Sequence, residues 1–106
     1  MAITRYTTPT LEFEYDLDLT NAKLWLSLEQ EDGVEIDKEV ESFTVDNNVT
    51  SFSVTLTQEE TAKFKPKKSV TIQLNYIFPD GSRDASSMTF VSTYDNLLNE
   101  VKWYAD

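Results

Sequence analysis

The sequence contains no cysteine and no histidine in 106 residues. Without cysteine, the chain has no disulfide, no thiolate nucleophile and no zinc–thiolate site. Without histidine, it lacks the commonest general base and transition-metal ligand, and its serine hydroxyls have no usual base to activate them. Pairs of carboxylates can hydrolyse glycosides, but among 19 acids such pairs arise by chance. We therefore expect no enzyme activity, no catalytic residue, no metal and no cofactor.

Glycine and proline are also scarce, with two and three residues, so turns must rely on Asn, Asp and Ser. The chain has no apolar run near the length of a membrane span, and its N-terminus lacks the apolar core of a signal peptide. Secretion by the common route is therefore unsupported. A hydrophobic fraction of 40% argues against disorder, and the length suits one domain over residues 1–106.

Basic residues are few, with 9 Lys and Arg against 19 Asp and Glu, for a formal net charge of −10. The excess belongs to one half: residues 1–60 carry 14 acids and 3 bases, whereas residues 61–106 carry 5 acids and 6 bases. Such a surface repels nucleic acid and anionic membranes, so we expect neither to bind directly, while a basic partner is conceivable. Solubility alone is the plainer explanation of an acidic balance.

The clearest local signals lie in residues 49–64. Phe52, Val54 and Leu56 alternate with Ser and Thr, which predicts a strand with one buried face. Thr57 and Glu60 then have the spacing of a capping box, and Pro66 should stop the helix that this box begins. A short helical turn is therefore expected near 57–64, and because it is too short to be stable alone, it must dock on a sheet.

The same two-residue alternation predicts further strands over 10–15, 24–28, 34–40, 43–45, 70–76 and 88–94, with an arm or edge strand in 1–8. In the strand 88–94, Met88, Phe90 and Tyr94 form the larger apolar set. Turn residues lie at 16–21, 29–33, 46–48 and 79–82. Near-helical spacing over 95–106, with Asp95 as a possible cap, predicts a short helix or an irregular tail.

About seven strands, with turns roughly every ten residues, are typical of an all-β, immunoglobulin-like β-sandwich. The helical turn would then cross from one sheet to the other. An open barrel is the alternative architecture.

The acids between Glu29 and Glu41 form the candidate binding face. Between Glu29 and Asp46 there are eight acids and one base, Lys38. Acids at alternate positions of one strand lie about 7 Å apart on one face, which approximates the phosphate spacing along a DNA strand. The candidate residues are Glu29, Glu31, Asp32, Glu35, Asp37, Glu39 and Glu41.

Two other patterns have more ordinary explanations. Asp16-x-Asp18-x-Thr20 and Asp80-x-Ser82-x-Asp84 place oxygen atoms at alternating positions, as calcium loops do, but neither completes the twelve-residue loop with its terminal Glu. An aromatic contact patch could also form, although core or tail packing is the commoner use of such residues; its members would be Tyr6, Trp25, Trp103 and Tyr104.

Three segments carry a resemblance to known proteins: Thr8-Pro9-Thr10, Leu56-Thr57-Gln58-Glu59-Glu60-Thr61 with Phe64, and Val70-x-Ile72-Gln73-Leu74 before a Gly81 turn. In these, the chain resembles a family of small, largely uncharacterised proteins encoded in phages and prophages of Gram-positive bacteria, often among virion-structural genes. It departs from the family at Arg5-Tyr6-Thr7, where members tend to have a basic, glycine-containing lead, and in its heavier acidic span. The resemblance implies a phage setting, in the host cytoplasm or the virion, and supplies no site residues.

Two functions follow as hypotheses. The first is a non-enzymatic phage protein that acts by protein–protein binding, as a virion structural or accessory protein on capsid or tail proteins or on copies of itself. The alternative is an acidic DNA mimic of the anti-CRISPR type, which would inhibit a basic, nucleic-acid-binding host defence nuclease.

Overall fold

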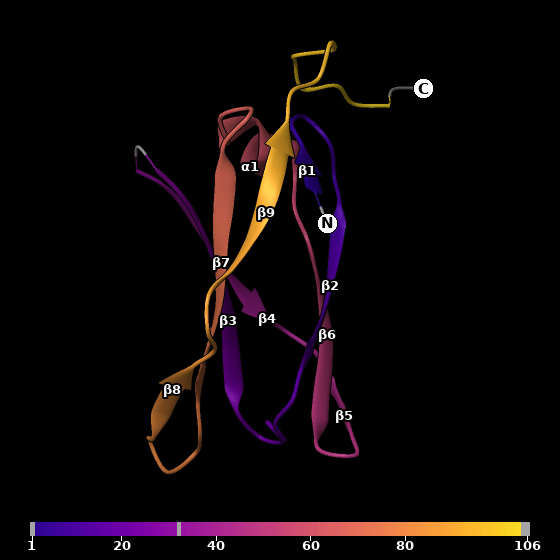
Figure 1. The fold of residues 1–106 in the computed structure, drawn as a ribbon. Helices are drawn as coiled ribbons and strands as arrows, with labels where there is room; N and C mark the ends of the chain where they lie inside the picture. Colours follow the sequence, from indigo (N-terminus) through magenta and orange to yellow (C-terminus); the bar gives the residue numbers. More distant parts are fainter. Residues whose placement is uncertain (1, 32, 105–106) are drawn as a thin grey trace.

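The computed structural model describes residues 2–31 and 33–104. Within them the chain is mostly β, with one short helix (Figure 1). In chain order the elements are β1 (Ala2–Thr4), β2 (Thr10–Tyr15), β3 (Lys23–Gln30), β4 (Val34–Val40), β5 (Thr44–Asp46), β6 (Val49–Thr55), α1 (Gln58–Lys63), β7 (Ser69–Ile77), β8 (Arg83–Ala85) and β9 (Thr89–Tyr94). No helix in these ranges is long and apolar enough to cross a membrane.

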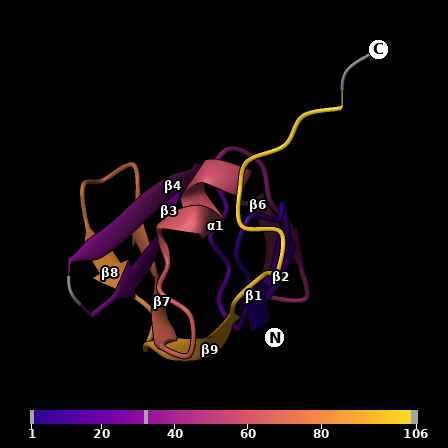
Figure 2. The ribbon, with the colours of Figure 1, turned by 90° about the horizontal axis from the view of Figure 1, so that it is seen from above.

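The strands form two sheets. The larger has the order β1-β9-β7-β3-β4, with the short β8 paired to β7, and the smaller has the order β2-β6-β5. All pairings are antiparallel except that of β1 with β9. Seen from above, the larger sheet curls around one side of the molecule and the smaller sheet lies across from it (Figure 2).

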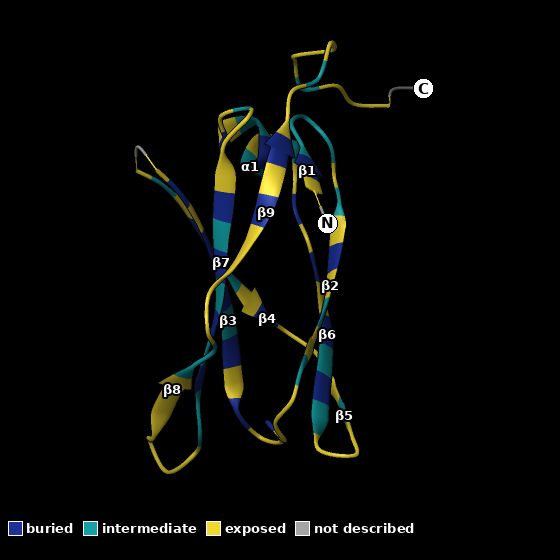
Figure 3. Cartoon of the chain, in the orientation of Figure 1, coloured by how far each residue is buried: buried dark blue, intermediate teal, exposed yellow. Residues whose placement is uncertain are grey.

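The core lies between the two sheets because each central strand alternates strictly (Figure 3). On β3 and β7, apolar side chains meet as neighbours, with Leu26 opposite Leu74 and Leu28 opposite Ile72. The smaller sheet contributes Leu11, Phe52 and Val54, all buried. These residues occupy the positions that the two-residue period predicts to be buried.

Helix α1 begins with the predicted capping box. The Thr57 hydroxyl accepts a hydrogen bond from the Glu60 amide at 3.1 Å, and the Glu60 carboxylate accepts one from the Thr57 amide at 2.8 Å. Thr61 and Phe64 are completely buried and dock the helix against the sheets. A six-residue helix is therefore stable here because both its start and its buried face have partners.

We expect Thr57→Ala to lower the free energy of unfolding by about 1 kcal/mol, because the Glu60 amide loses its capping acceptor. Urea denaturation followed by circular dichroism would measure the change. Thr57→Ser keeps the hydroxyl and should retain most of the stability, so equal losses in both variants would contradict a capping role.

Two turns use left-handed backbone as expected. Asn47 and Asn48 have φ of 51° and 63° and join β5 to β6, the two-residue hairpin geometry that Asn tolerates better than most residues. Gly33 has φ of 87°, which glycine adopts without strain, in the turn between β3 and β4.

The structure differs from the sequence-based prediction in three places. The described residues form nine strands instead of about seven, because β1 and β8 are three-residue strands whose pairing depends on β9 and β7. On β9 the buried residues are Val91 and Thr93, and the larger residues Met88, Phe90 and Tyr94 are exposed or precede the strand. Residues 95–104 form no helix, so of the two predicted forms the irregular one is correct.

Candidate functional site

Three of the predicted acidic residues share the outward face of β4. Glu35, Asp37 and Glu39 are exposed and alternate with inward-facing positions. Glu29 lies on β3 directly opposite Glu35, although like charges in that position are destabilising. The structure thus brings these four carboxylates onto one face of the larger sheet.

Two further predicted acids lie at the margins of this face. Glu31 follows β3 and Glu41 follows β4, and both are exposed. Asp32 lies outside the described residues. On the face itself, the Asp37 carboxylate accepts a hydrogen bond from the Ser27 hydroxyl at 2.6 Å. We use the term acidic face for Glu29, Glu35, Asp37 and Glu39.

Lys38, the base within the acidic span, lies on the other side of β4. Its ammonium group donates to a Glu60 carboxylate oxygen at 2.8 Å and to the Thr55 carbonyl at 3.0 Å. Burial pushes the pKa of Glu60 upward, but the hydrogen bonds from Lys38 and from the Thr57 amide outweigh it, and the pKa lies below its usual value. Lys38 therefore joins β4 to α1 and does not neutralise the acidic face.

The two calcium-like patterns form Asx turns. One Asp18 oxygen accepts from both the amide and the hydroxyl of Thr20, and one Asp80 oxygen accepts in the same way from Ser82. The side-chain hydrogen bond, followed by the backbone one, lowers the pKa of each aspartate. No group of three or more metal-ligating side chains occurs in 2–31 or 33–104, so these patterns serve the turns.

The four residues of the predicted aromatic patch lie on different elements. Tyr6 precedes β2 and has the Arg5 guanidinium 5.0 Å from its ring centroid. Trp25 is half-buried on β3, whereas Trp103 and Tyr104 are exposed beyond β9. Only the last two are placed together.

A groove that the sequence did not predict opens on the side of the molecule between β2 and β7. Its volume is about 170 Å³. We call it the side groove; its lining consists of Phe13, Glu14, Tyr15, Leu26, Phe52, Ile72, Leu74, Ser86, Ser87 and Thr89. Several of these residues belong to the core, so the groove gives access to core side chains.

The side groove exists because β2 is an edge strand. Within the described residues β2 pairs with β6 alone, so its other edge has no neighbouring strand. The Tyr15 and Tyr76 hydroxyls lie 3.2 Å apart beside the groove, and burial, followed by this contact, raises the pKa of Tyr76. No sequence signal could have found the groove, because it depends on which edges remain unpaired.

A second hollow, of about 580 Å³, lies over the smaller sheet where β5 begins. Its walls include the carboxylates of Glu12 and Glu14 and the ring of Phe43. Two carboxylates on one strand, without a third ligand, do not form a metal site among the described residues.

Exposed apolar side chains are concentrated after residue 87. Of the large hydrophobic residues that are exposed in the described chain, seven lie there: Met88, Phe90, Tyr94, Leu97, Leu98, Trp103 and Tyr104. The sequence pattern made the first three the larger apolar set of a strand, without stating which face of that strand is buried. A usable signal was present, since Val91 and Thr93 are β-branched and suit a packed strand position.

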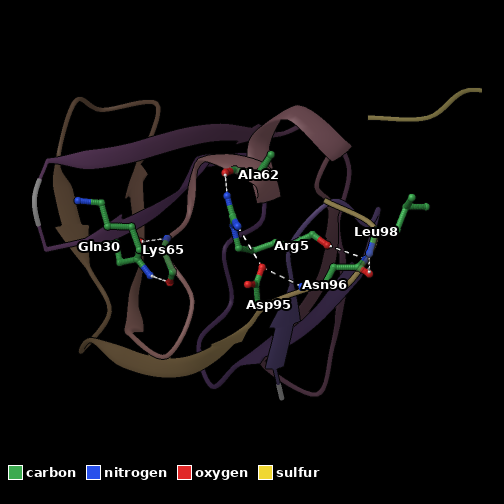
Figure 4. A network of polar contacts seen from close by, with 7 residues as sticks. All are labelled: Arg5, Gln30, Ala62, Lys65, Asp95, Asn96 and Leu98. Carbon is green, nitrogen blue, oxygen red and sulfur yellow. Dashed lines mark hydrogen bonds and ion pairs between the residues drawn. The ribbon is translucent and has the colours of Figure 1, made fainter. Parts of the chain in front are cut away.

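The C-terminal segment, residues 95–104, is held at the α1 end of the molecule (Figure 4). Arg5 donates to the Asp95 carboxylate at 3.0 Å and to the Ala62 carbonyl at 2.9 Å, and its own carbonyl accepts from the Asn96 amide group. Further along, the Gln58 side chain makes two hydrogen bonds to the backbone of Lys102. These contacts hold the segment in an irregular conformation, with its apolar side chains exposed.

Comparisons with known proteins define the fold alone. No protein-family model and no curated protein matches the chain. Among solved structures, it is similar to part of the uncharacterized protein lmo2446 from Listeria monocytogenes, crystallised with α-D-glucose, β-D-glucose, magnesium and calcium. The match has a TM-score of 0.58 and 11% identity, and it covers 87% of this chain but 8% of that one.

Proposed function

We propose that this chain is a non-enzymatic phage protein that acts by protein–protein binding, as a structural or accessory component of the virion. The observation that carries the proposal is the apolar surface over residues 88–104, where seven large hydrophobic side chains are exposed. Exposed apolar side chains gathered on one part of a chain are characteristic of interaction sites, and aromatic residues are enriched at the centres of interfaces. The phage setting rests on the resemblance in the segments at Thr8–Thr10, Leu56–Phe64 and Val70–Leu74.

Within this proposal the domain is an immunoglobulin-like β-sandwich. The strand order supports it: β9-β7-β3-β4 corresponds to the G-F-C-C′ sheet of variable-type domains, and β2-β6-β5 to their B-E-D strands. The glucose and metal ions in the Listeria crystal belong to a chain of which this domain matches 8%, so they suggest no ligand for this one.

The test is a pull-down of the tagged protein from phage-producing cells, with bound proteins identified by mass spectrometry. Washes at about 0.1 M and about 1 M ionic strength separate apolar from charged contacts, since the screening length falls from about 10 Å to about 3 Å. We expect capsid or tail proteins to remain bound in both washes. Purified virions that lack the chain, together with a pull-down that captures no virion protein, would overturn the proposal.

A DNA mimic is the second candidate, and the acidic face is the observation that favours it. Glu35, Asp37 and Glu39 occupy alternate positions of β4, about 7 Å apart by strand geometry. Lys38 binds Glu60 on the other side of the strand. Glu29 and Glu35 lie directly opposite each other, and the stability cost of this like-charge pair is one that a binding role would explain.

For this candidate we expect the triple reversal Glu35→Lys, Asp37→Lys and Glu39→Lys to weaken binding to a basic nuclease at least about tenfold, because three attractive charges become repulsive. Titration by calorimetry would measure the affinity. The matched control reverses Asp16, Asp46 and Asp84, which are exposed at the other end of the molecule and change the net charge equally. Equal weakening by both triple variants would indicate a general charge effect and not a mimic.

A further inference from the structure

We propose that copies of this chain assemble head to tail, with the C-terminal segment of one copy lying in the side groove of the next. This inference rests on the proposed protein-binding function and names its partner as a second copy of the chain. Three features carry it: an acceptor edge beside the groove, an apolar segment held away from its own groove, and a lysine patch at the α1 end that can meet exposed acids at the other end.

The acceptor is the open edge of β2. The Pro9 carbonyl accepts from the Leu56 amide, and in the antiparallel register Leu11, Phe13 and Tyr15 continue this hydrogen-bonded set. The backbone groups of the intervening residues, among them Glu12, therefore point to the unpaired edge. An extended segment can pair there as an added strand while its side chains enter the side groove, which is the recognition mode of β-augmentation.

The C-terminal segment suits that edge in length and pattern. Residues 97–104 span about 26 Å when extended, and the six residues of β2 span about 20 Å. In an extended conformation Leu97, Val101 and Trp103 point to one side, because side chains alternate along a strand. Apart from Asn99, which shares it, this side is apolar, as is most of the side-groove lining, which includes Phe13, Phe52 and Leu74.

The segment does not reach its own groove in this structure. From Thr89 at the groove, β9 runs toward the α1 end, and after Tyr94 the chain continues away from the sheets (Figure 1). Its first residues are bound by Arg5, and Lys102 is bound by Gln58. Seating in a second copy leaves the Arg5 contacts in place and releases exposed hydrogen bonds, namely those between Gln58 and Lys102 and the one from the Leu98 amide to the Asn96 side chain.

A lysine patch at the α1 end can meet acids at the opposite end of a second copy. The loop after α1 carries three exposed lysines, Lys65, Lys67 and Lys68, and Lys63 ends the helix. The α1 end also carries acids, among them Glu59, Glu60 and Asp95, so the complementarity is local to the lysine patch. The loops and strand ends at the opposite end carry exposed acids, Asp16, Asp18, Asp46, Asp80 and Asp84. Local complementary charge steers association and orients the partners.

Such a contact joins different surfaces on the two copies. A contact of this kind closes into a ring or continues as a filament, and it does not stop at a symmetric dimer. The proposal therefore requires each copy to act as donor and as acceptor, and these two roles can be removed separately.

The test is sedimentation velocity of the full chain at about 0.1 mM, a concentration well above a micromolar dissociation constant. We expect assemblies larger than dimers for the wild type. The donor-defective variant Leu97→Asp with Trp103→Asp should associate at least about tenfold more weakly. The acceptor-defective variant Glu12→Pro should do the same, because proline blocks the open edge of β2. The matched control, Thr44→Asp with Ser92→Asp, places the same two charges at exposed positions of β5 and β9, outside the C-terminal segment and the side groove, and should assemble as the wild type does.

The deciding measurement mixes the two defective variants. The donor-defective variant keeps an intact β2 edge, and the acceptor-defective variant keeps an intact C-terminal segment. The mixture should therefore form a one-to-one pair and nothing larger. Circular dichroism verifies that each variant is folded. If Glu12→Pro fails to fold, Glu12→N-methyl-alanine, incorporated by chemical ligation, blocks the same edge without the proline ring.

A wild type that is monomeric at this concentration would overturn the proposal, as would full assembly of the donor-defective variant. Failure of self-assembly can be told apart from failure of the proposed virion-binding function. A monomeric chain that still captures virion proteins would contradict self-assembly alone, whereas a monomeric chain that captures none would contradict both.

Discussion

Phe64→Ala is expected to lower the free energy of unfolding by about 3–5 kcal/mol, one of the two largest effects that we predict for a single substitution. Phe64 is completely buried and is among the largest fully buried side chains of the described residues. Its loss leaves a cavity at the junction of α1 with both sheets. A domain of this size typically has about 5–15 kcal/mol of stability in total, so the variant should be near its folding limit.

Urea denaturation followed by tryptophan fluorescence and circular dichroism measures this effect. The control is Phe90→Ala, which removes the same side chain from an exposed position and should change the stability by less than about 0.5 kcal/mol. Phe64 also docks α1, whose six residues cannot remain helical without tertiary contacts. If both variants lose similar stability, Phe64 does not anchor the core as the structure indicates.

Gln30→Met is expected to lower the free energy of unfolding by about 2–4 kcal/mol, although methionine has nearly the same shape. The Gln30 side chain accepts from the Lys65 amide at 2.6 Å and donates to the Lys65 carbonyl at 2.8 Å (Figure 4). Gln30 is 1% exposed, so water cannot easily replace these bonds. Each backbone group that loses its partner in a buried place costs about 1–3 kcal/mol.

The matched control is Gln73→Met on the neighbouring strand β7. Gln73 is half-buried and donates one hydrogen bond, to the Ser86 carbonyl at 3.0 Å, so its replacement should cost about 1 kcal/mol. Thermal unfolding of both variants gives the comparison. Hydrogen exchange at the amide of Lys65 should accelerate in the Gln30 variant alone. Unchanged exchange there would mean that Gln30 does not hold the loop between α1 and β7.

Periodicity predicted the longer strands, but alternation alone did not determine which face of a strand is buried. In β6 the alternation and the capping box at Thr57 agree, and the structure has both. In β9 alternation alone defines two faces without stating which is buried. The choice follows from pairing, because Val91 lies opposite the buried Val70, and Thr93 lies opposite the buried Ile3 on β1. Side-chain size pointed to the other face.

The candidate sites also divide into features that the local sequence determines and features that depend on distant residues. The acids of β4 share a face because residues two apart on any strand do so, and the sequence is sufficient for that. The direction of Lys38 depends on Glu60, which is 22 residues away in sequence. The side groove depends on the absence of a described neighbour for β2. Neither the contact of Lys38 with Glu60 nor the open edge of β2 can be predicted from the spacing of residues that are close in the sequence.

By itself, therefore, the sequence determined the seven longer or central strands, the helical turn near 57–64, the Asn and Gly turns and the shared face of Glu35, Asp37 and Glu39, since these depend on residues near one another in the chain. The tertiary structure alone decided which face of β9 is exposed, which edge of β2 is open and how the C-terminal segment is held. The segment could form a helix by its spacing, but Arg5 and Gln58, which are 90 and 44 residues away from their partners Asp95 and Lys102, bind it in another conformation. Long-range hydrogen bonds of this kind outweigh the weak preference of a short helix, because such a helix has too few internal bonds to compensate for its nucleation.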